Sequence, residues 1–499
     1  MCNKHLAVRL LLLLTVSALL LGLLAGCKSD PEPEPVDTQP PETDDPNNPY
    51  DANGYLKDAL PSDLKFGNES VDILCWNECP TVEFGVEQLT GDSISDAVYS
   101  RNLAVESRLE VVLNWIGIDG HWTNEAGFVA AVQNSVNGGL NLYDIIATYS
   151  QSAAAIANNS LVMNLNGLPY LDLDQPWWPA SLTETFQIGD YLFFVSGDLS
   201  TSLLNEMIVT FFNPALLTNV NPYDLVRNNE WTLEKLMELT EDAYIDRGTL
   251  GVKDKADTYG IICPYTYADG FFYGSGLVTV NTGRDGKLEV NSDYVGEKAD
   301  NLANLLQTMF HVRDSGAATG WNTQGDHTQT EFAQGLSVFL TANAGSAMTY
   351  MADVDIKYGI LPMPKYDSSQ ADYHTTASNM ITLYTLAGDC DEETATRAAA
   401  VLECLGSEGY RKVTPEMFEE CMKLRYAKDS DTGEMYDIIR AGLVFDIGRV
   451  FGGQMGNIAQ TTFRETVDEP NGGSWGAQTA GVEIMLQGYL DELNEKLGL

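Results

Sequence analysis

A short apolar segment near residue 71 ends in a tryptophan, an amide and a carboxylate. The segment 71–78 has the sequence VDILCWNE, which places Trp76, Asn77 and Glu78 at its end. A flat aromatic ring can cover the apolar face of a sugar, and amide and carboxylate groups can bind its hydroxyl groups. These three residues therefore suit carbohydrate binding, while a core position for Trp76 is equally compatible with the pattern.

Similar side chains occur at four other places along the chain. Tyr149 and Ser150 end a second apolar segment, YDIIATYS. Phe271 and Phe272 lie in the glycine-flanked segment YADGFFYGSG, where stacking on a ligand and core packing are equally compatible with the sequence. The segment TGWNTQGDHTQ contains Trp321 and Asn322 in polar surroundings that do not suit a core tryptophan, and Trp475 lies among glycines in NGGSWGAQ.

The sequence contains no familiar metal-binding or nucleotide-binding motif. H-E-x-x-H, Walker A and G-x-G-x-x-G patterns are absent. His311, His327 and His374 lack the spacing of zinc ligands. We therefore expect no metal or cofactor. A surface glycosidase remains an alternative, because its two carboxylates could be any pair among the 71 acidic residues.

The elements that would position these side chains alternate between strand and helix. Segments 71–78, 111–117 and 143–150 have the apolar runs of buried strands, and 96–110 and 127–139 have helical spacing. Strands that alternate with helices form parallel sheets with right-handed crossovers. Ligands of such sheets bind beyond the carboxyl ends of the strands, where residues 76–78 and 149–150 would lie.

The first residues have the pattern of a lipoprotein signal. Lys4 and Arg9 precede an apolar run over 10–24, which is shorter than a membrane-spanning helix requires. Leu-Ala-Gly-Cys at 24–27 resembles the bacterial lipobox, in which the cysteine is acylated and becomes the first residue. We therefore predict a signal peptide over 1–26 and a lipid anchor at Cys27, although a plain signal peptide with an incidental cysteine is the alternative.

Composition limits the partners and the compartment. The segment after Cys27 is rich in proline and acidic residues, so 27–65 is expected to be a disordered tether. A net charge of −43 excludes nucleic-acid binding in practice, because phosphate contacts require basic patches. Six cysteines remain outside the signal and the anchor, and their spacing favours buried free thiols over a disulfide framework. A local Cys75–Cys79 bridge is the alternative.

The order of several segments resembles one protein family, the extracellular solute-binding lipoproteins of ABC importers in their maltose-binding-like, carbohydrate-associated branch. The similar segments span about residue 71 to the C-terminus; they are YDIIATYS, QPWWPASLTETFQIGDYLFFVSGDLS, FFNPALL, EWTLEKLMELTEDAYIDRG, DTYGI, EFAQGLSVFL, YGILPMPKYD and DSDTGEMYDIIRAGLVFDIG. A departure is Pro214 in FFNPALL, where many relatives have a basic residue; we expect no functional consequence.

The resemblance implies a two-lobed α/β fold of the periplasmic-binding-protein type II class, with a ligand cleft between the lobes. Residues 66–200 and 370–412 would form the first lobe, and 201–369 and 413–499 the second. Chain crossings are expected near 198–204, near 365–378 and after 412, which adds Asp198 and Asn379 to the site. The predicted substrate-binding residues are Trp76, Asn77, Glu78, Tyr149, Ser150, Asp198, Phe271, Phe272, Trp321, Asn322, Asn379 and Trp475.

The resemblance also implies the function and the partners. A monomer on the extracytoplasmic face of a bacterial cell membrane would capture a solute, in particular an oligosaccharide. It would then close its lobes and deliver the ligand to the transmembrane subunits of an ABC permease. A carbohydrate-active hydrolase and a peptide-binding lipoprotein are the alternatives from other classes.

Overall fold

The computed structural model describes residues 48–251, 255–309, 326–468 and 474–499. Residues 53–499 form one compact unit that contains all the strands and helices discussed below. In the part of the chain that the structure describes, none of the helices combines the length and apolar composition needed to cross a bilayer. Trp321, Asn322 and Cys27 lie outside the described residues.

The first sheet has the strand order β12-β3-β1-β2. Its strands are β1 (Glu69–Trp76), β2 (Val111–Ile118), β3 (Ile145–Tyr149) and β12 (Thr382–Leu386). β1 pairs in parallel with both β2 and β3, whereas β12 runs antiparallel to β3. Strands alternating with helices thus form the parallel core of this sheet, as the sequence predicts. All five residues of β3 are buried because this strand lies between two others.

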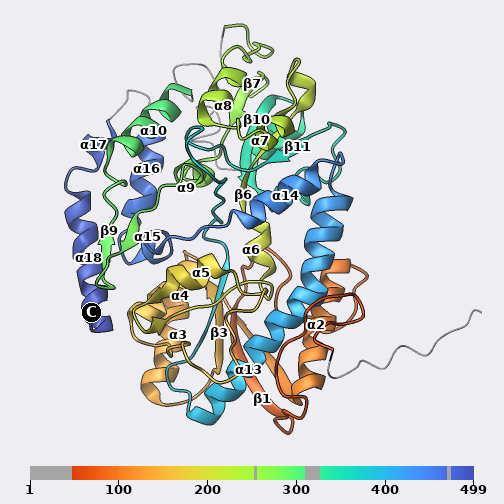
Figure 1. Cartoon of the computed structure of the whole chain (residues 1–499), viewed down its shortest axis with the longest axis vertical. Coiled ribbons are helices and arrows are strands. Elements are labelled where there is room, and N and C mark those ends of the chain that lie inside the picture. Colours follow the sequence, from red (N-terminus) through yellow and green to blue (C-terminus); the bar gives the residue numbers. More distant parts are fainter. Residues whose placement is uncertain (1–47, 252–254, 310–325, 469–473) are drawn as a thin grey trace, which may run out of the picture. The chain divides into compact units, whose positions relative to one another are not determined.

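Helices α2 (Ser93–Leu109), α3 (Glu125–Gly138), α4 (Ser150–Asn158) and α13 (Glu392–Glu408) lie around this sheet (Figure 1). Two of them begin at aspartate caps: the Asp92 side chain accepts a hydrogen bond from the Ser95 backbone N–H, and Asp391 accepts one from Thr394. α13 continues into two π-helical stretches, Gly409–Val413 and Pro415–Arg425.

The second sheet has the order β11-β6-β10-β7. Its strands are β6 (Ile208–Phe212), β7 (Tyr259–Ile262), β10 (Ser337–Asn343) and β11 (Gly359–Leu361). β10 runs parallel to β7 and antiparallel to β6. The helices of this part of the chain are α7 (Pro222–Arg227), α8 (Leu233–Thr240), α9 (Gly270–Gly274), α10 (Glu297–Gln307) and α12 (Asp326–Ala333).

The remaining elements connect the sheets or follow α13. Two short hairpins are β4–β5 (Gln187–Ile188 and Tyr191–Leu192) and β8–β9 (Val280–Thr282 and Leu288–Val290). The remaining helices are α5 (Ala180–Phe186), α6 (Thr201–Asn205), α14 (Thr432–Ala441), α15 (Ile447–Val450), α16 (Ile458–Asp468), α17 (Trp475–Gln478) and α18 (Val482–Leu497).

Three connecting segments run side by side between the two sheets. The Ile208 N–H donates to the Thr376 carbonyl, and the Ser378 N–H donates to the Glu206 carbonyl, each at 2.8 Å. The Val444 N–H donates to the Thr375 carbonyl at 2.8 Å. The expected positions of the lobe boundaries stay a prediction, but all eight strands of the two sheets lie within the residue ranges expected for their lobes.

The cysteines follow the sequence expectation. Cys75, Cys79, Cys263, Cys390, Cys404 and Cys421 are free thiols in the described part of the chain, and four of them are buried. Burial raises the pKa of the Cys75 thiol to about 12, so this thiol stays protonated and unreactive at neutral pH.

One buried acid makes the stability of the first-sheet region depend on pH. Glu403 on α13 accepts hydrogen bonds from the Trp178 indole N–H at 3.0 Å and the Asp172 backbone N–H at 3.2 Å, both at Oε2. Its Oε1 is buried without a hydrogen-bond partner among the described residues. Burial raises the pKa of Glu403 to about 7, against these two hydrogen bonds. The folded state therefore binds more protons than the unfolded state, and stability falls as pH rises from about 4.5 to 7.

We expect Glu403→Gln to remove this dependence of stability on pH. The amide oxygen of glutamine still accepts hydrogen bonds, and the neutral side chain places no charge in the core. The free energy of unfolding of the variant relative to the wild type should rise between pH 5 and pH 8 by up to about 3 kcal/mol. Urea unfolding at several pH values measures this difference. Glu393→Gln, an exposed position on the same helix, is the control. A difference between variant and wild type that does not change with pH would contradict the prediction.

Candidate functional site

The carboxyl ends of β1, β2 and β3 lie at one edge of the first sheet. Trp76 pairs with Ile118 in the register of β1 and β2, and Cys75 pairs with Ala147 in that of β1 and β3. Trp76 is fully buried beneath this edge. Its indole N–H donates to Thr382 Oγ1 at 3.0 Å, and its ring centroid lies 5.6 Å from that of Tyr149. The structure therefore places Trp76 in the core below the edge.

Asn77 and Glu78 continue from β1 into the loop above that edge. Asn77 is exposed, and its amide donates to Asp119 Oδ1 at 3.0 Å. Glu78 accepts the Gly120 backbone N–H and the Asn124 amide, each at 2.8 Å. Burial alone would raise the pKa of Glu78, but these two hydrogen bonds and nearby His121 together hold it below its usual value. Glu78 thus fixes the loop that follows β2.

The structure brings Tyr149, Ser150 and Asn379 together. The Ser150 hydroxyl donates to the Asn379 carbonyl at 2.7 Å, and the Tyr149 hydroxyl donates to Gln151 Oε1 at 3.1 Å. The Asn379 amide donates to Gln460 Oε1 on α16 at 3.1 Å. Burial raises the pKa of Tyr149 to about 12, so its hydroxyl is a neutral donor and acceptor. This group links the first sheet to the C-terminal helices.

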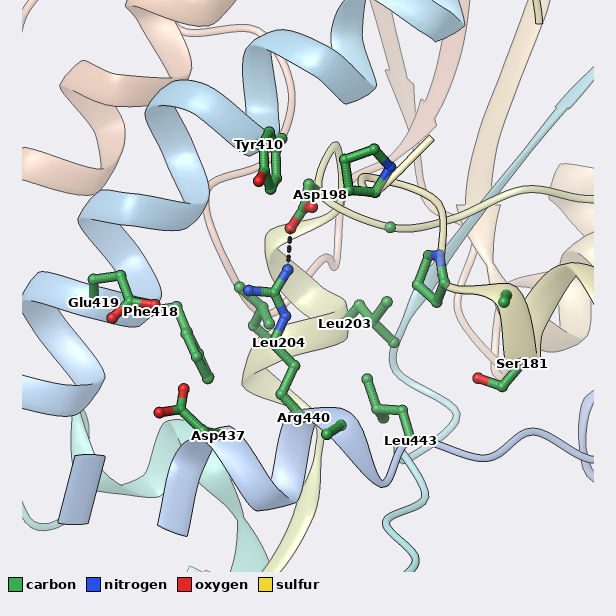
Figure 2. A pocket seen from close by; sticks show the side chains of 15 residues that line it. Ser181, Asp198, Leu203, Leu204, Tyr410, Phe418, Glu419, Asp437, Arg440 and Leu443 are labelled. Atoms are coloured by element: carbon green, nitrogen blue, oxygen red, sulfur yellow. Dashed lines mark hydrogen bonds and ion pairs between the residues drawn. The ribbon is translucent and has the colours of Figure 1, made fainter. Parts of the chain in front are cut away.

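Asp198 lies apart from these residues. It lines a cavity that we call the rear cavity (Figure 2). This cavity has a volume of about 550 Å³ and is lined by residues that include Leu203, Leu204, Phe418 and Arg440. Asp198 Oδ1 accepts hydrogen bonds from Arg440 Nη2 and Thr414 Oγ1, each at 2.6 Å. Burial raises the pKa of Asp198, and the Arg440 guanidinium opposes this shift. Asp198 joins the first connecting segment to α14.

Phe271, Phe272 and Trp475 are buried side chains. The rings of Phe272 and Trp475 each pack against Phe463, with centroid separations of 5.3 and 5.6 Å. The Trp475 indole N–H donates to the Tyr294 carbonyl at 2.7 Å. The structure therefore joins two of these predicted site residues in one aromatic cluster of the second-sheet region, away from the edge of the first sheet.

A second cavity, which we call the cleft cavity, is formed by residues from both sheet regions. Its volume is about 440 Å³. It lies at the carboxyl ends of β7 and β10, next to the loop that follows β1. Its lining residues are Pro80, Asn205, Glu206, Pro264, Thr266, Tyr267, Gln329, Asn343, Gly345, Thr349 and Tyr350.

Glu206 is the one ionisable carboxylate among the residues that line this cavity. Its Oε1 accepts amide hydrogens from Asn205 at 2.7 Å and Asn343 at 2.9 Å, and its Oε2 accepts the Ser378 hydroxyl at 2.5 Å. A carboxylate has about four acceptor positions, so one remains for a ligand hydroxyl. Burial raises the pKa of Glu206, and the three donors lower it in part.

The walls of the cleft cavity are held in place by buried charges. Glu83 anchors the loop that contains Pro80, because its Oε2 accepts the Ser202 backbone N–H at 2.9 Å and its Oε1 accepts the Tyr384 hydroxyl at 2.7 Å. Arg464 donates to the Thr266 carbonyl and to Asp269, each at 2.9 Å. These contacts fix the loops that carry Pro80 and Thr266 at the wall of the cavity.

Glu206 is not among the site residues predicted from the sequence, although the sequence contains a signal for it. Asn205 and Glu206 immediately precede the apolar run MIVTFF, in which a strand begins at Ile208. A polar pair directly before a buried strand marks the edge of a sheet in the same way that Asn77 and Glu78 do after β1. The predicted acid of the first connecting segment is Asp198, eight residues earlier. That prediction follows from the family resemblance alone.

The fold was compared with known proteins. No family model matches the chain, and no curated protein sequence matches it. Solved structures do match. A cyclo/maltodextrin-binding protein complexed with maltotetraose is 12% identical at a TM-score of 0.53 and covers 87% of this chain and 98% of its own. Mycobacterium tuberculosis UspC is 13% identical at a TM-score of 0.55, with 84% and 100% covered.

A third neighbour is a family 1 extracellular solute-binding protein from Bifidobacterium longum subsp. infantis, with 12% identity, a TM-score of 0.53, and 84% and 99% covered. At such low identities the likeness concerns the fold. It confirms the predicted fold class, because the matches cover 84–87% of this chain and nearly the whole of each neighbour. The chain therefore has the two-lobed α/β fold of the extracellular solute-binding proteins.

Proposed function

We propose that this protein is the substrate-binding subunit of an ABC importer and captures an oligosaccharide in the cleft cavity. The observation that carries the proposal is the cavity itself. It combines a buried carboxylate, Glu206, with the amides of Asn205 and Asn343 and the rings of Tyr267 and Tyr350. Hydroxyl-rich ligands require such acceptors and donors, and their apolar faces require aromatic rings.

The chemistry of the lining favours a neutral ligand. Among the residues that line the cleft cavity there is no lysine, arginine or histidine, so an anionic ligand would find no opposite charge there. Two proteins of the same fold are complexed with maltotetraose and with maltotriose, respectively. These ligands belong to those proteins, and they support the same class of ligand for this chain.

Ligand capture would bring the two lobes together around the connecting segments. The first and second segments are joined by backbone hydrogen bonds on both sides of Met207, so they can bend as one hinge. The closed form would then dock on the transmembrane subunits of the permease. The protein would bind its ligand without converting it. It would act as a monomer that is anchored through Cys27 to the extracytoplasmic face of the membrane.

A thermal-shift screen tests the proposed ligand class. The purified protein would be mixed with mono-, di- and oligosaccharides and with short peptides. A ligand at a hundred times its dissociation constant should add about 2.7 kcal/mol to the stability. A shift with sugars supports the proposal. A shift with peptides alone would reject the carbohydrate class, and hydrolysis of the sugars would reject a binding protein in favour of an enzyme.

Glu206→Gln should weaken binding of a sugar found in this screen by about five- to ten-fold, because a charged acceptor becomes a neutral one. The variant should still fold, since the amide oxygen can accept from Asn205 and Asn343 while its NH₂ donates to the Ser378 hydroxyl. Isothermal titration calorimetry measures the affinity. Glu419→Gln in the rear cavity is the matched control. Equal losses for both variants, or a loss for Glu419→Gln alone, would place the ligand elsewhere.

Lipid attachment at Cys27 is tested by metabolic labelling with a palmitate analogue in a bacterial host that processes lipoproteins. We expect the wild type to be labelled and to sediment with membranes, and Cys27→Ser to lose the label. Cys2→Ser is the control, because Cys2 would be removed with the signal peptide. Labelling that persists in Cys27→Ser would contradict the predicted anchor.

A further inference from the structure

Trp122 is exposed to an unusual degree. Its side chain is 66% exposed, whereas the other tryptophans among the described residues are buried or half-buried. It lies in the loop 119–124, between β2 and α3. Tryptophan is enriched at binding interfaces, because its large flat ring is apolar and its indole N–H is polar.

The loop that carries Trp122 is fixed by hydrogen bonds. Glu78 holds it at Gly120 and at Asn124, as described above, and the Ser152 hydroxyl donates to the Gly120 carbonyl at 2.6 Å. The Asn124 backbone N–H donates to the His121 carbonyl at 2.7 Å. The neighbouring His121 ring lies 5.5 Å from the Trp122 ring, centroid to centroid. An aromatic ring on a fixed loop loses little conformational entropy when it binds a ligand.

The loop lies at the same sheet edge as the segment that lines the cleft cavity. The Asn77 N–H donates to the Ile118 carbonyl at 2.9 Å, so the loops that follow β1 and β2 start side by side. Three residues after Asn77, the loop that follows β1 contributes Pro80 to the cleft cavity. Trp122 therefore lies on the loop that neighbours this cavity-lining segment at the carboxyl ends of β1 and β2.

Polar groups that suit sugar hydroxyls lie at the start of the loop that contains Trp122 and of the neighbouring loop after β1. Asn77 and Asp119 are both exposed, and they are joined at 3.0 Å through the Asn77 amide and Asp119 Oδ1. A carboxylate and an amide next to a flat apolar ring repeat the chemistry of the cleft cavity at its rim. A neutral, hydroxylated ring with one apolar face satisfies both features.

We propose that Trp122, with Asn77 and Asp119, forms an outer subsite that stacks against a sugar ring of an oligosaccharide whose inner rings occupy the cleft cavity. This inference rests on the proposed function. It narrows the substrate class to oligosaccharides that are longer than the cleft cavity. The cavity of about 440 Å³ lies toward the lower end of the roughly 300–1,000 Å³ of small-molecule sites, which leaves the outer rings of a longer chain to the rim.

The test compares affinities along series of malto-, cello- and xylo-oligosaccharides of one to six units, by calorimetry on the purified protein. For a series that binds, Trp122→Ala should weaken the longest members about ten-fold and leave the shortest unchanged, while Trp122→Phe should keep most of the affinity. Glu206→Gln should weaken every length. Tyr489→Ala, at an exposed aromatic residue on α18, is the matched control and should weaken none.

The outcomes separate this inference from the proposed function. If Glu206→Gln weakens binding but Trp122→Ala weakens no length, or all lengths equally, the outer subsite is wrong and the proposed function stands. If no member of any series binds the wild type, the proposed function fails for these sugars and the subsite fails with it. Unfolding midpoints of Trp122→Ala and the wild type should agree, because the side chain is exposed.

Discussion

The buried carboxylate of Glu206 is the interaction on which the arrangement of the site depends. Its three donors belong to three different segments: Asn205 in the first connecting segment, Ser378 in the second, and Asn343 at the end of β10. A buried charge without such partners would be strongly destabilising. The same hydrogen bonds that make its burial tolerable therefore fix where the connecting segments meet the second sheet, and they leave the carboxylate at the wall of the cleft cavity.

Both sheets place the carboxyl ends of parallel strands next to the cleft cavity. β1 and β2 end together because they are parallel, and β7 and β10 end together for the same reason. Loops at both edges then supply the cavity, Pro80 from one side and Tyr267 and Tyr350 from the other. Since helices cover the faces of such sheets, the strand ends are where polar side chains can face a ligand without disturbing the core.

The tryptophans show how a residue type can serve opposite purposes in one chain. Trp76 and Trp475 are fully buried, and each satisfies its indole N–H with an acceptor far away in sequence. Trp122 follows the neighbouring strand and remains in solvent. The adjacent polar residues do not distinguish the two situations, because polar neighbours on a loop are compatible with an indole that points either into the core or out of it.

The sequence by itself determined the class of the fold and where its first parallel strands end. Apolar runs such as IIATY predicted strands, and their alternation with helical segments implied parallel strands. These signals are local, so one sequence is enough to read them. Tertiary structure alone decided which side chains reach the cavity. Glu206 accepts hydrogen bonds from Asn343 and Ser378, which lie 137 and 172 residues further along the chain. The buried Trp76 donates its indole N–H to Thr382, 306 residues further along. Contacts over such distances depend on how the sheets and connecting segments pack, and no short-range pattern encodes them.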